Sequence, residues 1–229
     1  MWNRRAAECG QVDPVQCVDQ VRDRSRELSV DINNYPFCTI EPNIGIVEVP
    51  DARMQALADI VKPQRMQYAT TEFVDIAGLV AGASKGEGLG NQFLATIRET
   101  DGIVNVVRCF EDDNVVHVAG KVDPISDIAT IVTELALADL TTVEKAQERN
   151  VKLVRSGDKD AAKLGELLVQ VAACLNEGKP ARTLKLDPAQ RALLKPLCLL
   201  TMKPVMYVAN VAEKGFANNP LLTRVEEYA

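Results

Sequence analysis

The stretch from Thr71 to Leu94 contains the residues best suited to phosphate chemistry. An apolar strand is predicted to end at Asp75, and Gly78 follows three positions later. An aspartate at a strand end can bind Mg²⁺ directly or through water, and the glycine N–H can donate to a terminal phosphate. Asp-x-x-Gly occurs in many turns, but its place after an apolar strand predicts a nucleotide-dependent switch.

A second candidate motif follows the strand predicted at Pro204–Asn210, in the sequence ANVAEKG. In GTP-binding domains the comparable motif is Asn-Lys-x-Asp, whose aspartate binds two donors on guanine. Here Asn210 is present, Val211 takes the lysine position and Glu213 takes the acid position. These changes should weaken guanine binding and allow adenine. Taken alone, the motif favours an ordinary loop over a base pocket.

A third candidate is Thr39 in NYPFCTIEPN. Its hydroxyl could bind both Mg²⁺ and a terminal phosphate if this segment is mobile, as switch segments are. Without the other two motifs, the segment would be read as a plain loop.

The bulk composition is that of a globular protein. The chain has 229 residues, a net charge of −6 and 47% hydrophobic residues, so a surface coated in positive charge for nucleic acid is not expected, and neither is direct binding to DNA. A local basic patch is compatible with these numbers. No apolar run is long enough for a bilayer and no signal-peptide core is visible, so we expect a cytoplasmic protein without a membrane partner. The six cysteines form no Cys-x-x-Cys pair, which argues against a zinc site.

The elements that must position these residues are predicted from periodicity. Strands are expected at Ile44–Val49 and Ile103–Phe110, and a helix after Asp51 with Leu57, Ile60 and Val61 facing inward. Apolar residues then recur at spacings of three and four, which predicts two helices packed as an antiparallel hairpin; they are Ile128, Val132, Leu135 and Ala138, then Leu164, Leu168, Val171 and Leu175. Strands, a helical excursion and a further strand indicate an α/β domain with a helical insertion.

Four segments together, NYPFCTIEPN, FVDIAGLVAGASKGEGLGNQFL, IRETDGIVNVVRCF and GKVDPISDI, resemble the YchF / Obg-like ATPase family of P-loop NTPases. The resemblance runs from residue 34 to residue 229. It implies a Ras-like G domain with a mostly parallel sheet and a coiled-coil insertion. It also implies binding and hydrolysis of ATP in preference to GTP, with Mg²⁺ held by Thr39 and Asp75, and association with the ribosome, through the large subunit or the whole particle.

The resemblance also implies a division of the chain. The G domain would span 34–121 and resume at 204–229, with the coiled-coil insertion at 122–203 and an anomalous segment at 1–33. The family's G domain continues further and is followed by a TGS domain, so we expect this chain to lack that domain.

Three more roles follow from the resemblance. Leu79 occupies the place where Ras-like enzymes use glutamine to orient the attacking water, and His117 matches a histidine proposed to replace it. Cys38 matches the family's redox-linked cysteine. A lone histidine in an apolar stretch is often structural, and a buried thiol is often inert, so these readings stay open.

The family's phosphate-binding loop, Gly-Leu-Pro-Asn-Val-Gly-Lys-Ser-Thr, is missing from the N-terminal segment. Reverse translation of Trp2–Gln20 with chosen synonymous codons, read one base later, spells Gly-Ile-Val-Gly-Leu-Pro-Asn-Val-Gly-Lys-Ser-Thr-Leu-Phe-Asn-Ala-Leu-Thr. We therefore hypothesise that the loop is encoded but read in the wrong frame, through an error or a real frameshift. The alternative is a divergent N-terminus that never formed this loop.

The consequence for the chain as written is severe. The loop's backbone N–H groups and lysine carry most of the phosphate binding, and its hydroxyl residue holds Mg²⁺. We expect the written chain to bind ATP weakly or not at all, to lose the central strand of its sheet and to fold poorly. A GTPase, or a non-enzymatic ribosome-binding fragment, is the alternative function.

Overall fold

The computed structural model describes residues 4–9, 43–76, 89–112 and 121–229. Its centre is one five-stranded sheet in the order β2-β3-β1-β4-β5. The strands are β1 Arg4–Cys9, β2 Asn43–Glu48, β3 Thr70–Ile76, β4 Gly102–Arg108 and β5 Val205–Asn210. All neighbours pair in parallel except β2, which runs antiparallel to β3 at one edge. The predicted α/β class with a mostly parallel sheet is confirmed.

The central strand is present, which corrects the expectation that it would be lost. Segment Arg4–Cys9 pairs with β3 on one side and β4 on the other. The hydrogen bonds of a parallel sheet are made by backbone N–H and C=O groups, and every residue of this segment has both. A strand can therefore pair with β3 and β4 at this position without an apolar sequence. What the written residues lack is the continuous apolar run usual for a strand covered on both faces.

Helices pack against the sheet through apolar side chains of β3 and β4. The helices are α2 Ala52–Val61, α3 Leu89–Glu99, α4 Pro124–Arg155, α5 Lys159–Asn176, α6 Pro188–Leu194 and α7 Pro220–Tyr228, with 3-10 turns η1 Ala181–Thr183, η2 Lys195–Leu197 and η3 Leu200–Met202. One core cluster joins Val74 and Ile76 of β3 to Ile97 of α3 and Leu135 of α4. On the other face of β4, Val104 and Val106 are also buried. Strand β4 is therefore buried on both faces, which agrees with its nearly continuous apolar sequence.

The helical hairpin is confirmed, but the α4 residues predicted to form it are wrong. Leu135 and Ala138 pack in the cluster with β3 and α3, and Ile128 and Val132 pack in the cluster with Val107 of β4. The α4 side chains that share a cluster with α5 include Ala136 and Val143. The helical period shows that α4 has apolar faces, but not which element covers each of them.

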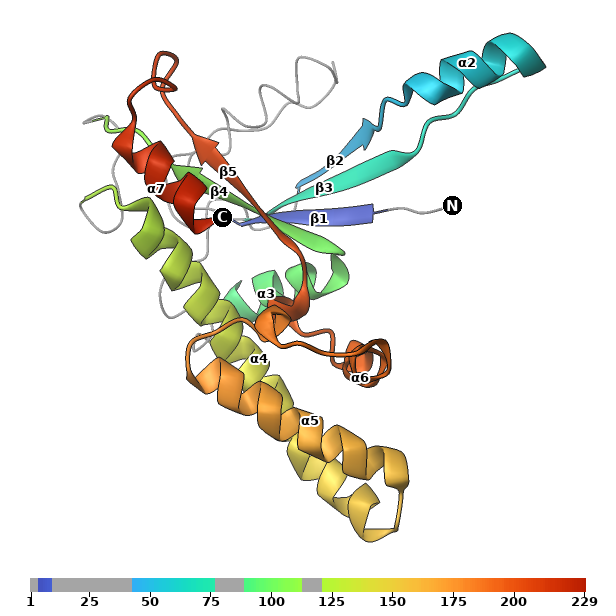
Figure 1. Ribbon diagram of the computed structural model, residues 1–229, viewed down its shortest axis with the longest axis vertical. Helices are drawn as coiled ribbons and strands as arrows, with labels where there is room; N and C mark the ends of the chain where they lie inside the picture. The colour runs from blue at the N-terminus through green and yellow to red at the C-terminus, as the bar shows by residue number, and fades with distance from the viewer. Residues whose placement is uncertain (1–3, 10–42, 77–88, 113–120) are drawn as a thin grey trace.

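α4 and α5 run antiparallel, and the hairpin extends away from the sheet with its turn at the far end (Figure 1). Ser156 caps the end of α4, Gly157 takes a φ of 87°, and the side chain of Asp158 caps the start of α5. Gly178, with a φ of 73°, follows the end of α5, and only glycine adopts such a backbone at little cost.

One prediction about α2 is wrong. Leu57, Ile60 and Val61 are exposed, with 57%, 78% and 70% of their surface accessible, and α2 has no buried residue. The helix lies beyond the ends of β2 and β3, away from the body of the protein (Figure 1). The helical period shows which residues share a face, but it does not show that another element covers that face.

No helix in the described parts of the chain combines the length and apolar content needed to cross a membrane.

Candidate nucleotide site

The carboxyl ends of four parallel strands, β3, β1, β4 and β5, meet at one edge of the sheet. In open α/β sheets this edge is where ligands bind. Asp75 is the next-to-last residue of β3 and lies opposite Glu8 of β1. Asn210 is the last residue of β5 and lies opposite Arg108 of β4. Both sequence-predicted residues therefore stand at the same edge.

Three strand spacings separate the positions of Asp75 and Asn210, because β1 and β4 lie between β3 and β5. At about 4.8 Å per spacing, this is roughly 14 Å. A nucleoside triphosphate bound along the edge can therefore place its phosphates near Asp75 and its base near Asn210. The strand next to Asp75 on the side of Asn210 is β1, which lies between β3 and β4.

The carboxyl group of Asp75 is half-buried at the end of β3. Burial raises its pKa above the ordinary value of 3.8, because a charged carboxylate is less stable away from water. A divalent cation beside it would offset that cost and favour the ionised form. The residue type and its place therefore fit Mg²⁺, a hard cation that prefers oxygen ligands.

Asn210 has a buried side-chain amide with unused hydrogen-bonding capacity. Its Nδ2 is shielded from solvent, and none of the residues that the structure describes accepts a hydrogen bond from it. Its backbone carbonyl is engaged, accepting from the N–H of Cys109 at 2.7 Å. A buried amide donor without a partner costs free energy, which an acceptor on a ligand or on another segment would recover. This observation fits a base-binding asparagine.

The loop after β5 is held in a defined shape. Gly215 donates to the carbonyl of Ala212 at 2.7 Å, and a Cβ on Gly215 would come within 3.0 Å of that same oxygen. Val211 packs into the cluster that contains Val107 and Val225, whereas Glu213 is exposed. The loop therefore keeps its backbone fixed and leaves its acidic side chain free for a ligand.

Asn219 is a supporting residue that the sequence reasoning missed. Its Nδ2 donates to the carbonyls of Cys109 and Gly215, both at 2.9 Å, and its Oδ1 accepts from the N–H groups of Leu221 and Leu222. It thus ties the loop after β5 to the end of β4 while capping α7. The signal in the sequence was Asn followed by Pro220, which is typical of a helix start.

Arg108 was also missed, because an arginine inside an apolar run is easily taken for an irregularity. It is 2% exposed at the end of β4. Its guanidinium donates to the carbonyls of Phe110 and Asp112 at 3.0 and 3.2 Å, and lies 4.6 Å from the centre of the Phe110 ring. Arg108 therefore fixes the direction in which the chain leaves β4.

Five other predicted site residues, Cys38, Thr39, Gly78, Leu79 and His117, lie outside the described residues. Within the described ranges no group of three or more His, Cys, Asp or Glu side chains could hold a metal ion by itself. The predicted Mg²⁺ site uses a single carboxylate with a hydroxyl and phosphate oxygens, so it does not depend on such a group.

Comparison with known proteins shows where this fold belongs. The family model described as "50S ribosome-binding GTPase" matches residues 23–143. A protein of Haemophilus influenzae named ribosome-binding ATPase YchF is 56% identical over 203 residues, 89% of this chain and 56% of that protein. The Bacillus subtilis protein of the same name is 53% identical over 199 residues, 86% of this chain and 54% of that protein.

The solved structure of the Schizosaccharomyces pombe YchF GTPase covers 99% of this chain with a TM-score of 0.75 and 34% identity, and 62% of that chain is matched. The chain spans about half the length of the curated relatives it matches. The match extends through the helical hairpin as well as the sheet. The chain belongs to the 50S ribosome-binding GTPase family and, within it, to the YchF group of P-loop NTPases.

Proposed function

We propose that this chain carries the nucleotide-binding domain of an ATP-hydrolysing, ribosome-associated P-loop NTPase. The buried Nδ2 of Asn210, which has no acceptor among the described residues, carries the proposal, because it stands at the same sheet edge as Asp75, roughly three strand spacings away. Curated relatives are named ribosome-binding ATPases, which supports ATP as the nucleotide and the cytoplasmic ribosome as the partner. The ribosomal contact would be with the large subunit or the whole particle.

At the phosphate end of the site, Asp75 and Thr39 would hold Mg²⁺. Mg²⁺ held there would supply positive charge against the negative charge that develops on the phosphate oxygens. Gly78 would donate its backbone N–H to the terminal phosphate. Leu79 would leave the attacking water without the usual glutamine, and His117 would orient that water and accept its proton.

At the base end, Asn210 would donate to a ring acceptor of the base, beside Val211. Glu213 replaces the aspartate that holds guanine in the usual motif, and a longer side chain places its carboxylate differently. This is why we assign ATP ahead of GTP. The family description and the Schizosaccharomyces pombe structure both use the word GTPase, so GTP remains the alternative nucleotide.

The decisive experiment uses a frame-restored chain, in which the segment from Trp2 to Gln20 is replaced by its shifted reading. Fluorescent ATP and GTP analogues are titrated with Mg²⁺, and each is displaced by the unlabelled nucleotides. We expect tighter binding of ATP and loss of affinity in Asn210→Ala. The matched control is Asn176→Ala, an exposed asparagine at the end of α5.

Each result has a clear meaning. Tighter binding of GTP would assign the protein as a GTPase. Binding of neither nucleotide by a folded, frame-restored chain would overturn the enzymatic proposal. A frame-restored chain that sediments with ribosomes but binds neither nucleotide would instead favour a non-enzymatic binding fragment.

A further inference from the structure

The far end of the α4–α5 hairpin, residues 149–163, is positively charged on a chain whose net charge is −6. It contains five basic residues against two acidic ones; the basic ones are Arg149, Lys152, Arg155, Lys159 and Lys163. Every residue from 151 to 160 is exposed. We call residues 149–163 the hairpin tip.

Both acidic residues of the hairpin tip are already engaged. The carboxylate of Asp158 accepts from the N–H groups of Asp160 and Ala161 at 2.9 and 3.1 Å, which caps α5. The carboxylate of Asp160 pairs with Lys163 at 3.7 Å. The other four basic side chains form no ion pair with any residue that the structure describes. Their charge is therefore available to a partner.

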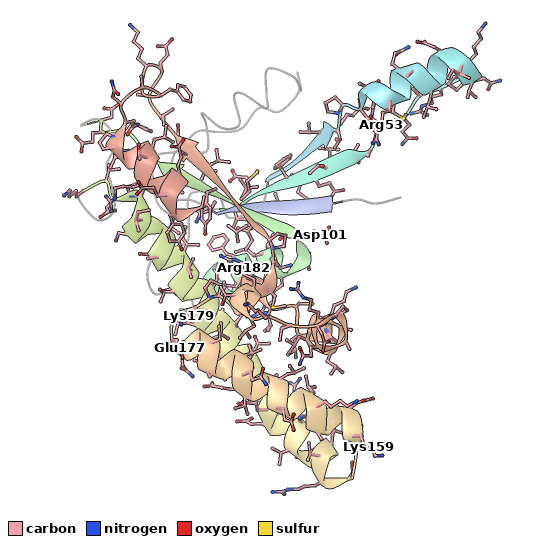
Figure 2. The ribbon with its side chains drawn as sticks, in the orientation of Figure 1. Arg53, Asp101, Lys159, Glu177, Lys179 and Arg182 are labelled. Carbon is pink, nitrogen blue, oxygen red and sulfur yellow. The ribbon has the colours of Figure 1, made fainter. Side chains whose placement is uncertain are left out.

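Three of these basic residues form a stripe along the end of α4. Arg149, Lys152 and Arg155 are spaced three residues apart, so they lie on adjacent turns of one side of the helix and cover about 9 Å along its axis. Lys159 begins α5, just across the turn, and Figure 2 shows it at the far end of the hairpin. The positive charge thus continues around the end of the hairpin.

The hairpin tip is rigid before it meets a partner. The buried side chain of Asn150 donates from Nδ2 to the carbonyl of Ala161 at 2.7 Å and so joins α4 to α5. Gly165 allows this contact, because a Cβ there would come within 3.0 Å of the same Nδ2. Ser156 closes the turn by donating from its hydroxyl to the carbonyl of Leu153 at 2.7 Å. Little ordering is then required on binding.

Apolar side chains lie among the charges. Val151, Leu153 and Val154 are 46%, 52% and 41% exposed. Exposed apolar side chains rimmed by charged groups mark an interaction surface rather than an ordinary solvated helix end. The chain's overall negative charge would repel a polyanion, so contact with one must be concentrated where positive charge is gathered.

We propose that the hairpin tip docks on RNA, with Arg149, Lys152, Arg155 and Lys159 binding phosphates of the sugar–phosphate backbone. The inference rests on the ribosome association in the proposed function and is independent of nucleotide binding. Basic groups on a rigid helical end bind phosphates without reading base sequence. On the ribosome, the ligand is a phosphate-rich surface of ribosomal RNA.

The test compares two variants of equal net charge in the full written chain. The tip variant is Arg149→Gln, Lys152→Gln and Arg155→Gln. The control is Arg65→Gln, Lys185→Gln and Lys195→Gln, which removes three exposed basic residues elsewhere. Equal far-UV circular dichroism and equal thermal midpoints establish that the variants are folded like the parent. Binding is then measured without nucleotide to purified 50S subunits, by sedimentation, and to protein-free ribosomal RNA, by fluorescence anisotropy across a salt series.

We expect the tip variant to bind both probes about tenfold or more weakly at moderate salt, with the slope of log affinity against log salt reduced by about two to three. The control should stay within about twofold of the parent, since its charges contact no phosphate. Loss of binding to 50S subunits with unchanged binding to protein-free RNA would mean that the hairpin tip contacts a ribosomal protein, and would overturn the RNA proposal. Equal loss in both variants, no loss in either, or no binding by the parent would also overturn it.

A failure of the proposed enzymatic function would look different. It would appear as absent nucleotide binding in the frame-restored chain, whatever the RNA measurements show.

Discussion

The carboxylate of Asp139 accepts hydrogen bonds from both the backbone N–H and the hydroxyl of Thr201, each at 2.7 Å. It also accepts from the N–H of Leu200 at 2.8 Å, and Arg98 of α3 lies 3.9 Å away. Asp139 is fully buried on α4, and its partners lie about sixty positions later in the chain. This carboxylate therefore joins the helical insertion to the segment that leads back into the sheet.

Replacing Asp139 with alanine should lower the free energy of unfolding by about 3 kcal/mol or more, because several buried donors lose their acceptor at once. Thr201→Val is the graded comparison. It removes only the hydroxyl and should cost about 1 kcal/mol. Urea unfolding followed by circular dichroism measures both. Equal losses would show that the carboxylate acts through the hydroxyl alone.

The contribution of Asp139 to stability should depend on pH. Burial raises its pKa above the ordinary 3.8, an effect that the hydrogen bonds from Thr201 and Leu200 and the charge of Arg98 only partly offset. The folded state then holds the proton more tightly than the unfolded state. The favourable contribution is complete below pH 3.8 and is lost as pH rises through the folded-state pKa.

The check is the difference in unfolding free energy between the parent and Asp139→Asn, measured across mildly acidic pH. We expect the parent's advantage to shrink as pH rises. An advantage that grows with pH would show that hydrogen bonding, not burial, dominates the pKa.

The described cysteines should differ sharply in reactivity. Burial, with a smaller effect from nearby Asp127, raises the pKa of Cys109 to about 11, and the side chain is fully buried. Cys198 is exposed. Because the thiolate is the reactive form, iodoacetamide at pH near 8 should modify Cys198 while leaving Cys109 intact until urea is added. Peptide mass mapping after timed labelling measures the extent of modification at each cysteine. Early modification of Cys109 would mean that the end of β4 opens readily.

Asn219→Ala should affect both stability and the nucleotide site. The cap of α7 is lost, which costs about 1 kcal/mol. The loop after β5 also loses its tie to the carbonyl of Cys109, so nucleotide affinity of the frame-restored chain should fall as well. Asn219→Asp keeps the helix cap but removes the two Nδ2 donor bonds. If the aspartate variant binds nucleotide like the parent, the tie does not position the loop.

The frameshift hypothesis for the N-terminal segment can be tested on the DNA that encodes it. Resequencing the region that encodes Met1 to Asn34 should show the phosphate-binding loop one base out of frame. The frame-restored chain should bind nucleotide more tightly than the written chain, because the shifted reading supplies the glycines, the lysine and the hydroxyl residues of the loop. Micromolar ATP affinity in the written chain, or DNA that encodes the loop in no frame, would contradict the reconstruction.

Local signals in the sequence determined the elements of this protein. The turn Ser156-Gly157-Asp158 and the helix start at Asp187 each act through contacts within a few residues. The same is true of Asp75 and Asn210, which sit at strand ends that the sequence makes visible. Parallel pairing then brings strand ends to one edge, so the position of the candidate site could be predicted.

Tertiary structure alone decided which faces are covered and which polar groups are paired. The apolar face of α2 reads in the sequence like a buried one, yet Ile60 is exposed. Asp139 reads like a surface residue of a helix, yet it is buried against Thr201. The sequence Asn219-Pro220 is typical of a helix start, but it does not indicate the hydrogen bond from Asn219 to the carbonyl of Cys109, 110 residues away. Burial and long-range pairing depend on segments distant in the chain, and a local pattern does not contain that information.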